Sequence, residues 1–544
     1  MSSVDEQAIE PQEHPVDGRP PSVWAPLRNR VYRNLFMASF GSNIGTWMQG
    51  VAAQWFLVEQ HSPDVVVALV QTASLGPTLL FGLFAGALAD LFDRRRLLIL
   101  LQSYAVAVAL ALAVLTYLGR LTPTTLLMFT VAIGCASALA GPDWQAIQPE
   151  VVPREQIPAV AMLGSVSGNA SRAIGPAIGG CIVALAGPAA VFAINAISFA
   201  GIIVALLVWQ RPKQLAPLER EHFGQAIISG LLYVVNGPIF RRILLRTALF
   251  LFPASALLAL LPVAAARTWH LGAGGYGVAL GVIGFGALIG AVVAAPLHRR
   301  MSDNVLLAAS AAVYGVAPLA VVWLPFAAAI PILMLSGVAW LITLATLNAA
   351  AQLALPQWVR ARALSLYLLI STGAQAIGAY VWGAVASQAG CDTALLWSAV
   401  ALGVAALSVV GLPLRANTGK LDVDVSTAWS EPRLMFEPCP HDGPVLVAVR
   451  YHVSEQNQDD FIKAMSKVRR SRLRTGGHSW RLYHSVGQTD VFLERFTVAS
   501  WSEFERQRTE RWLGYDSENF TAAVSYTVDH NRTDEYYLAK RVPK

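Results

Sequence analysis

Long apolar runs recur along most of this 544-residue chain and limit what it can fold into. A helix needs about twenty mostly apolar residues to cross the hydrocarbon core of a bilayer. By that rule we place twelve spans, at 35–58, 65–89, 97–118, 122–145, 158–185, 188–209, 243–266, 273–296, 304–324, 327–354, 361–387 and 393–414. The composition agrees, because 55% of the residues are hydrophobic and only 14% are charged. The sequence therefore predicts an all-α membrane protein.

The basic residues between the spans are distributed asymmetrically. Arginines fall in alternate loops, at Arg28 to Arg33, Arg94 to Arg96, Arg154, Arg211 to Arg246, Arg299 to Arg300 and Arg360 to Arg362, and the other loops carry only Arg120 and Arg267. Such a bias marks the cytoplasmic side of a membrane protein. We expect a multi-pass protein of the cell membrane with both termini in the cytoplasm. Because membrane orientation explains the net charge of +6, we do not expect nucleic-acid binding.

The longest polar interval within the membrane region divides the spans into two sets of six. The segment Gln145 to Val152 resembles Gln352 to Val359, and Arg172 to Gly175 resembles Gln375 to Gly378, at equivalent places in the two sets. Such duplication is typical of transporters. We divide the chain into a disordered cytoplasmic tail at 1–30 that lacks the features of a signal peptide, a first half at 31–210, a cytoplasmic linker at 211–242, a second half at 243–414, a linker at 415–442 and a soluble domain at 443–544.

Hydropathy falls in the C-terminal segment to that of a soluble domain. Strands are predicted at 445–453, 479–485, 491–498 and 535–540, and helices at 459–475 and 501–513. This β-α-β-β-α-β order is typical of a ferredoxin-like α+β fold. The four cysteines, Cys135, Cys181, Cys391 and Cys439, have no metal-ligand or redox spacing, so no metal or other cofactor is expected.

A few polar side chains interrupt the spans and are candidates for substrate binding or proton coupling. Arg172 and Asp143 are the two charges that we place inside the bundle, where a charge is costly and needs a cavity or a partner. The uncharged candidates are Asn43, Gln49, Gln54, Gln145, Gln352 and Gln375. A structural ion pair between Arg172 and Asp143, and hydrogen bonds between helices, are the alternatives. We expect a central site lined by the first, fourth and fifth spans and their counterparts, the seventh, tenth and eleventh.

Two motifs resemble the major facilitator superfamily. Gly86, Asp90, Arg94 and Arg95, between the second and third spans, resemble its cytoplasmic loop signature, although Leu91 and Asp93 depart from the pattern. The resemblance implies a conformational latch formed by these four residues. The fifth span carries Gly175, Pro176, Gly179 and Gly180, which resemble the end of a motif of drug–proton antiporters in this superfamily. A plain small-residue packing face is the alternative for these glycines.

Longer phrases resemble the enterobactin-exporter-like branch, also called transmembrane secretion effectors. They are Ser42 to Met48, Ala89 to Arg95 and Trp144 to Arg154. The resemblance implies a twelve-helix bundle that exports a siderophore-like or drug-like small molecule, driven by protons. Nothing resembles a phosphate-binding loop between a strand and a helix, so ATP is not expected as the energy source.

Residues 476–483, 494–496 and 500–504 resemble the small α+β barrels related to antibiotic-biosynthesis monooxygenases. That resemblance implies dimerisation through the C-terminal domain. No nucleophile and base pattern is visible, so we do not expect an enzyme. A membrane-anchored enzyme that acts through this domain, or a lipid translocator, are the alternatives to an exporter.

Overall fold

A computed structural model describes residues 23–209, 232–414, 425–426 and 434–539. Within these ranges it leaves out the side chains of 83–91, 149, 154 and 529–531. Most of the predicted tail and much of both linkers lie outside the described residues, so those predictions stand as such. All helices, strands and contacts named below lie within the described residues.

The first half begins with a short 3-10 turn, η1 (Ala25–Arg28), and continues with five long helices. They are α1 (Arg30–Glu59), α2 (Asp64–Leu91), α3 (Arg94–Tyr117), α4 (Pro123–Val151) and α5 (Ile157–Val208), with η2 (Arg154–Gln156) between the last two. Helix α5 breaks at Gly187, whose φ of 78° is reached easily only by glycine, and Pro188 follows. Its two arms are the fifth and sixth predicted spans.

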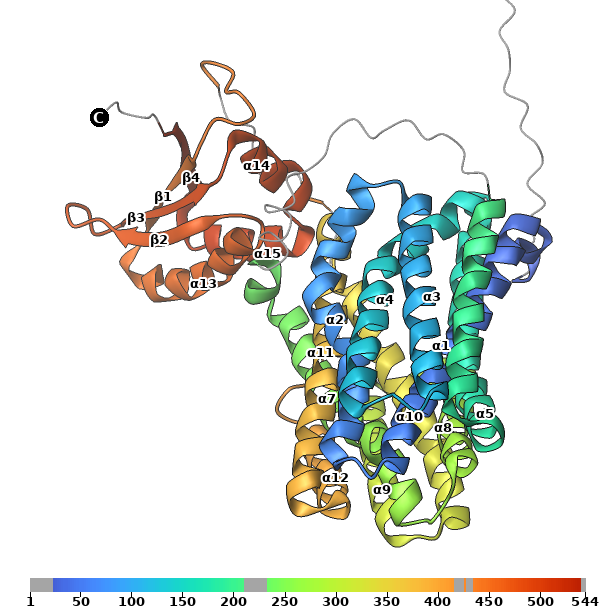
Figure 1. Ribbon diagram of the computed structural model, residues 1–544. Coiled ribbons are helices and arrows are strands. Elements are labelled where there is room, and N and C mark those ends of the chain that lie inside the picture. The colour runs from blue at the N-terminus through green and yellow to red at the C-terminus, as the bar shows by residue number, and fades with distance from the viewer. Residues whose placement is uncertain (1–22, 210–231, 415–424, 427–433, 540–544) are drawn as a thin grey trace, which may run out of the picture.

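The second half holds the other six helices. They are α7 (Pro238–Arg267), α8 (Ala273–Arg300), α9 (Asp303–Trp323), α10 (Phe326–Leu353), α11 (Gln357–Ala389) and α12 (Cys391–Leu407). Nine of the described helices are long and apolar enough to cross a membrane, with α5 counted once. Together with the second arm of α5, the more polar α1 and the shorter α12, they form the predicted twelve-helix bundle (Figure 1). The predicted fold class is confirmed.

One buried charge was not expected inside the bundle. Arg246 falls within the predicted span 243–266 but was counted with the cytoplasmic arginines, and α7, which begins at Pro238, carries this residue two turns into the bundle. There it is only 5% exposed, and its Nη2 lies 3.5 Å from the hydroxyl of Ser408. The start of this helix was predicted five residues too late, at 243, because residues 241 and 242 are both arginine.

Small residues join the two halves. A Cβ atom on Gly180 of α5 would lie 2.6 Å from the carbonyl oxygen of Ala273 and 2.8 Å from Cα of Gly277, both in α8. On the other side of the bundle, a Cβ on Gly383 of α11 would lie 3.0 Å from Cα of Val65 in α2. Close helix approach of this kind is how membrane helices gain packing energy, since lipid supplies no hydrophobic drive between them. The halves therefore meet along α5–α8 and α2–α11.

The C-terminal domain has the predicted sheet. Its strands are β1 (Val445–Val453), β2 (His478–His484), β3 (Val491–Val498) and β4 (Thr527–Leu538), in the antiparallel order β2-β3-β1-β4. The helical elements are η3 (Glu455–Asn457), α13 (Gln458–Arg474), α14 (Trp501–Arg506), η4 (Gln507–Arg511) and α15 (Gly514–Val524). This order of strands is that of a ferredoxin-like fold.

Three details of this domain differ from the prediction. Helix α15 was missed, and the helix predicted at 501–513 ends as α14 at Arg506 before the five-residue π-helical turn η4. Strand β4 begins at Thr527, eight residues before the prediction. Because β4 is an edge strand, its first half is polar and lacks the alternation of an inner strand.

A buried polar network occupies the core of the domain. Glu494 of β3 is fully buried and accepts hydrogen bonds from the Tyr451 hydroxyl at 2.7 Å, the Trp480 indole at 2.8 Å and Nε of Arg472 at 3.1 Å. Burial and the neighbouring Glu494 raise the pKa of Tyr451 well above its usual range. The hydroxyl therefore stays protonated and keeps donating to the carboxylate.

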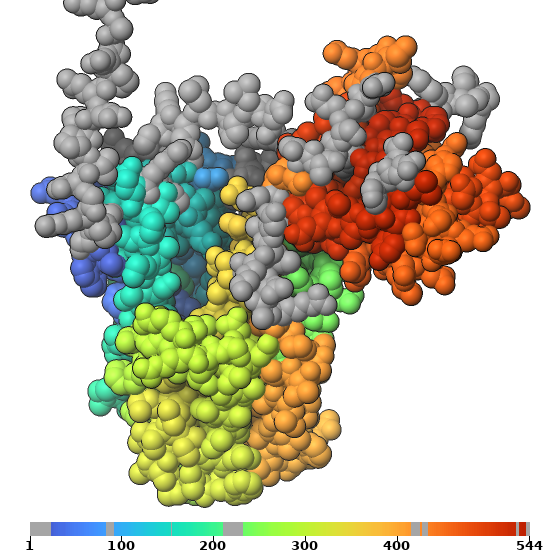
Figure 2. Space-filling view, turned by 180° about the vertical axis from the view of Figure 1, so that it is seen from behind, coloured from blue at the N-terminus to red at the C-terminus, as the bar shows by residue number. Residues whose placement is uncertain are grey.

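The C-terminal domain lies against one end of the bundle, next to the second half (Figures 1 and 2). The guanidinium of Arg511 lies over the ring of Trp358 at the start of α11, with Cζ 5.0 Å from the ring centre. That of Arg474 lies over Tyr233, which precedes α7, at 5.6 Å. We call this end of the bundle the domain end and the opposite end, where α1 meets α2 and α7 meets α8, the distal end.

Candidate functional site

A cavity of about 350 Å³ lies between the two halves. Helices α1, α2 and α5 line it from the first half, and α7, α8, α9, α10 and α11 from the second. Its polar and aromatic lining residues are Thr46, Trp47, Gln54, Gln71, Ser74, Arg172, Tyr276, Tyr314, Trp340 and Gln375. The remaining lining residues are aliphatic, proline or glycine. A small, largely apolar organic molecule matches such a lining.

Arg172 supplies the one charge among the described residues that line this cavity. It lies on α5, and its Cζ is 5.2 Å from the ring centre of Trp47 and 6.0 Å from that of Trp340. The two indole faces stabilise the cation, because their negative quadrupoles attract it. The buried Nε of Arg172 has no hydrogen-bond acceptor among the described residues.

The other polar groups of the cavity are mostly engaged. The Tyr276 hydroxyl donates to Oε1 of Gln54 at 2.6 Å, and the Tyr314 hydroxyl donates to the carbonyl of Ala254 at 3.1 Å. The indole Nε1 of Trp340 is an exception, since this side chain is 4% exposed and its N–H has no acceptor in the described part of the chain. The cavity thus holds two buried donors, on Arg172 and Trp340, that lack an acceptor.

Bonds between the halves gather at the distal side of the cavity. Arg267 of α7 pairs with Asp64 of α2, with Nη2 2.8 Å from Oδ1 and Nη1 3.1 Å from Oδ2. Nearby, the Val65 amide donates to the Ser387 hydroxyl at 2.8 Å. The Thr72 hydroxyl donates to the carbonyl of Ala376 at 2.8 Å. In the described residues these contacts join α2 to α7 and α11 and close the distal end.

A two-half helical bundle with a central cavity can be compared with known proteins. The family model described as "transmembrane secretion effector" matches residues 21–524, which is most of the chain. The chain belongs to this family. It is similar to the staphyloferrin A transporter of Staphylococcus aureus, with 26% identity over 53% of this chain and 72% of that protein. It is also similar to the enterobactin exporter EntS of Shigella boydii, with 25% identity over 51% of this chain and 66% of that protein.

Solved transporter structures share the fold of this transmembrane secretion effector. The nucleoside transporter NupG covers 70% of this chain over its whole length, with a TM-score of 0.59 and 12% identity. A bacterial homologue of the lysosomal transporter Spinster covers 73% of this chain, with a TM-score of 0.56 and 14% identity. Both are major facilitator structures, so the bundle has the major facilitator fold.

Four of the residues predicted from sequence meet in the central cavity of the secretion effector. Gln54, Arg172 and Pro176 line it from the first half, and Gln375 from the second. The expected set of helices is partly wrong, because α2, α8 and α9 line the cavity and α4 does not. The rotation of each helix about its axis decides which helices reach the cavity, and hydropathy alone does not report it.

The other predicted residues lie elsewhere in the bundle. Gln49 is buried and accepts a hydrogen bond from Asn195 in the second arm of α5. Gln145 and Gln352 are exposed, and Gln352 donates to Asn348 at 2.9 Å. Asp143 is fully buried in α4, and no ion pair joins it to Arg172 in the structure described. The proposed coupling of these two charges is therefore not a direct contact in this state.

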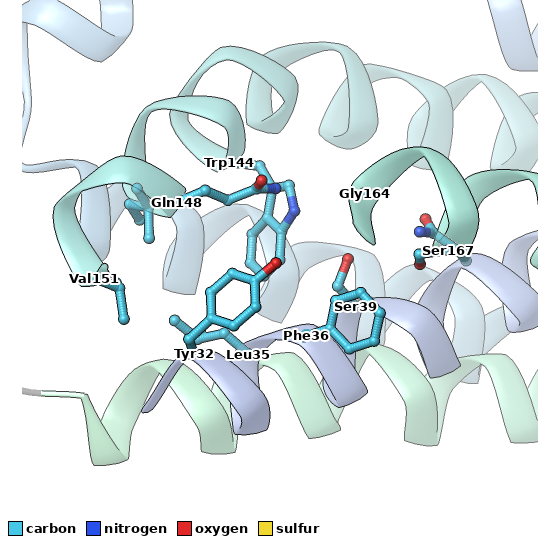
Figure 3. A pocket seen from close by; sticks show the side chains of 11 residues that line it. Tyr32, Leu35, Phe36, Ser39, Trp144, Gln148, Val151, Gly164 and Ser167 are labelled. Carbon is cyan, nitrogen blue, oxygen red and sulfur yellow. The ribbon is translucent and has the colours of Figure 1, made fainter. Parts of the chain in front are cut away.

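Asn43 lines a second, smaller cavity of about 180 Å³ inside the first half (Figure 3). This cavity lies between α1, α4 and α5 toward the domain end. Figure 3 shows Tyr32 and Ser39 of α1 facing Trp144 of α4, with Ser167 of α5 beyond them. It is separate from the central cavity, with which it shares no lining residue.

The predicted latch is described only in part. The side chains of Gly86 and Asp90 lie outside the described residues, so their role stays a prediction. Arg94 pairs with Glu150 of α4 at 2.9 Å. Arg95 donates to the carbonyls of Leu206 and Leu207 at the end of α5, at 2.8 and 3.0 Å. Both arginines thus fasten helices of the first half to one another at the domain end.

The glycine motif of α5 packs this helix closely. A Cβ on Gly175 would lie 2.7 Å from Cβ of Trp47, and one on Gly179 would lie 2.8 Å from Cα of Met48, so both hold α5 against α1. Gly180 faces α8 across the boundary between the halves, and Pro176 lines the cavity. Helix packing therefore explains Gly175, Gly179 and Gly180, which was the alternative interpretation of this motif.

Sequence reasoning missed Trp340, Tyr314 and Tyr276 in the cavity of this secretion effector. Trp340 and Tyr314 are aromatic residues with a polar group in the middle of apolar spans, whereas Tyr276 lies near the start of its span. Trp and Tyr are usually found near the membrane–water interfaces, so the depth of Trp340 and Tyr314 was a usable signal.

Proposed function

We propose that this protein is a secondary active exporter of the cell membrane, which moves a small molecule from the cytoplasm to the outside by proton antiport. The central cavity between two six-helix halves carries this proposal. A site at the interface of two repeats can be exposed to either side when the halves rock against each other. The family membership and the similarity to the staphyloferrin A transporter and the enterobactin exporter support export of a small organic molecule.

The closed distal end fits a state that loads from the domain end. In the part of the chain that the structure describes, the ion pair and hydrogen bonds between the halves all lie at or beyond the cavity on the distal side. We infer that the domain end is cytoplasmic, with both termini, because the arginine-rich loops lie there. The passenger then enters beside the C-terminal domain and leaves after the distal contacts separate.

Arg172 and Asp143 are the proposed proton-coupling groups. Asp143 is fully buried in the bundle and Arg172 lines the central cavity, and charged residues at such places commonly mark substrate or proton pathways. They are not in direct contact in the structure described, so coupling between them requires a change of state. Dimerisation through the C-terminal sheet stays a prediction of the resemblance to the small α+β barrels.

An efflux assay tests the proposal. The full-length protein is reconstituted in proteoliposomes that are loaded with a panel of organic acids, neutral compounds and amines, with and without a protonophore. We expect efflux of a subset of the panel that depends on the proton gradient. Efflux that equals that of empty liposomes for every compound would contradict the proposal.

A variant that ends at residue 415 separates the exporter from the membrane-anchored enzyme. We expect the shortened chain to retain gradient-dependent efflux, since all cavity residues precede residue 415. Chemical change of a panel compound by the full-length protein, lost on truncation, would favour the enzyme instead.

A further inference from the structure

We propose that the passenger is an organic carboxylate with an apolar, ring-bearing body, bound through Arg172 and Trp340. This inference rests on the proposed transport function and names the substrate class of the central cavity. Three observations carry it: the charge of the cavity, its unpaired donors and its aromatic walls.

The charge of the lining favours an anion. Arg172 is the one charged side chain among the described residues that line the cavity, and none of them is acidic. Its potential is therefore not cancelled at the site. A cation in a low-dielectric cavity attracts an anion strongly and repels a second cation, so an ammonium passenger is disfavoured.

The unpaired donors favour a carboxylate in particular. Nε of Arg172 and Nε1 of Trp340 both lack an acceptor in the described structure. Arg172 Cζ lies 6.0 Å from the Trp340 ring centre, so the two side chains are neighbours in the cavity wall. A buried donor without an acceptor costs free energy, and an anionic acceptor recovers it.

The nearby hydroxyl groups do not compete for this role. The Tyr276 hydroxyl donates to Gln54, and the Tyr314 hydroxyl donates to the carbonyl of Ala254. Both phenols are therefore engaged within the protein. The acceptor group of a passenger is thus directed to Arg172 and Trp340.

The walls around these donors favour a ring on the passenger. The indole of Trp47 lies on Arg172, and Leu258, Leu280 and Ile283 add aliphatic surface from the second half. Aromatic and aliphatic walls bind apolar rings by burying their surface. A cationic head on the same ring would leave the two donors unpaired, and a neutral amide would offer them one carbonyl oxygen and no charge.

Three probes with one naphthalene body test the inference on the full-length protein. They are naphthoate, naphthamide and naphthylmethylammonium, which carry an anionic, a neutral and a cationic head. Binding is measured by titration calorimetry in nanodiscs. We expect naphthoate to bind about tenfold or more tightly than naphthamide, since a hydrogen bond to a charged group contributes at least this factor. The ammonium should bind most weakly.

Substitutions test whether the preference for naphthoate over naphthamide comes from the donors on Arg172 and Trp340. Arg172→Gln should make naphthoate and naphthamide bind alike, and Arg172→Lys should keep part of the preference because it keeps the charge but loses the planar fork. Trp340→Phe keeps the ring, removes the N–H and should weaken naphthoate more than naphthamide, because the hydrogen bond to a carboxylate is the stronger one. Arg246→Gln is the control, because it removes another buried arginine of the bundle outside the central cavity and should leave the preference unchanged.

Three results would overturn the inference: tightest binding of the ammonium, binding of none of the probes, or a preference for the acid that survives Arg172→Gln. A failure of this inference can be distinguished from a failure of the proposed transport function. Gradient-dependent efflux of amines or neutral compounds by both the wild type and Arg172→Gln would reject the carboxylate while leaving the exporter in place.

Discussion

Arg511 of the C-terminal domain stacks on Trp358, at the point where α11 begins, with 5.0 Å between its Cζ and the ring centre. A second such contact, Arg474 on Tyr233, lies beside it, and Tyr233 meets Trp358 edge to face. In the described residues these cation–π contacts fasten the domain to the second half. The domain should therefore move with that half when the bundle rocks.

Removing the contact between Arg511 and Trp358 should weaken the attachment of the C-terminal domain to the bundle. A cation–π contact contributes about 0.5–2 kcal/mol, so Arg511→Ala should raise the undocked fraction severalfold. Spin labels on Ser466→Cys of α13 and Arg299→Cys of α8, both exposed, report the distance. We expect a broader distance distribution for Arg511→Ala and an unchanged one for Lys463→Ala, which alters an exposed ion pair within the domain. Equal distributions in all three proteins would show that the contact does not hold the domain.

The ion pair between Asp64 and Arg267 should hold the distal end closed. Asp64 is 5% exposed but Arg267 is 60% exposed, so solvent screens the pair and its contribution should be about 0.5–1 kcal/mol. Asp64→Asn should speed hydrogen exchange of the amides in 64–70 by about two- to fivefold on that basis. The swapped pair Asp64→Arg with Arg267→Asp should restore slow exchange. Failure of the swap to restore it would mean that the contact is incidental.

The glycine contact between α5 and α8 should not tolerate a side chain. A Cβ on Gly180 meets the backbone of Ala273 and Gly277, which cannot turn aside, so Gly180→Ala should destabilise the bundle by about 1–3 kcal/mol. Gly168→Ala on the same helix is the matched control, because nothing lies within 4 Å of its Cβ. Thermal unfolding of the two purified variants compares them. Equal midpoints would show that the halves do not pack this closely.

The network around Glu494 should be essential for the C-terminal domain. Glu494→Gln leaves the buried guanidinium of Arg472 without its counter-charge and should cost about 3–5 kcal/mol. Asp460→Asn, which breaks the exposed pair with Lys463, should leave stability unchanged. Urea-dependent proteolysis of the domain in the full-length protein measures both. A domain as resistant in Glu494→Gln as in the wild type would contradict this view of its core.

The sequence predicts the helices well and the cavity only in part. Each span is a local property of about twenty residues, so its position could be determined without knowing its neighbours. Gln54, Arg172 and Gln375 were found because polar groups are costly in a span. Trp340 and Gly277 were missed because their roles depend on which face of α10 or α8 meets the first half, and this depends on tertiary packing. The start of the polar edge strand β4 was predicted eight residues too late, because its pairing in the sheet also depends on tertiary packing.

Labelling from both sides of the membrane tests the central claim most directly. In a cysteine-free background, Gln375→Cys places one thiol in the central cavity, and a membrane-impermeant maleimide is applied from either side. We predict that it reacts mainly from the side of the C-terminal domain, and that Asp64→Asn increases reaction from the other side. Equal labelling from both sides in the wild type, or none from either, would contradict an alternating cavity.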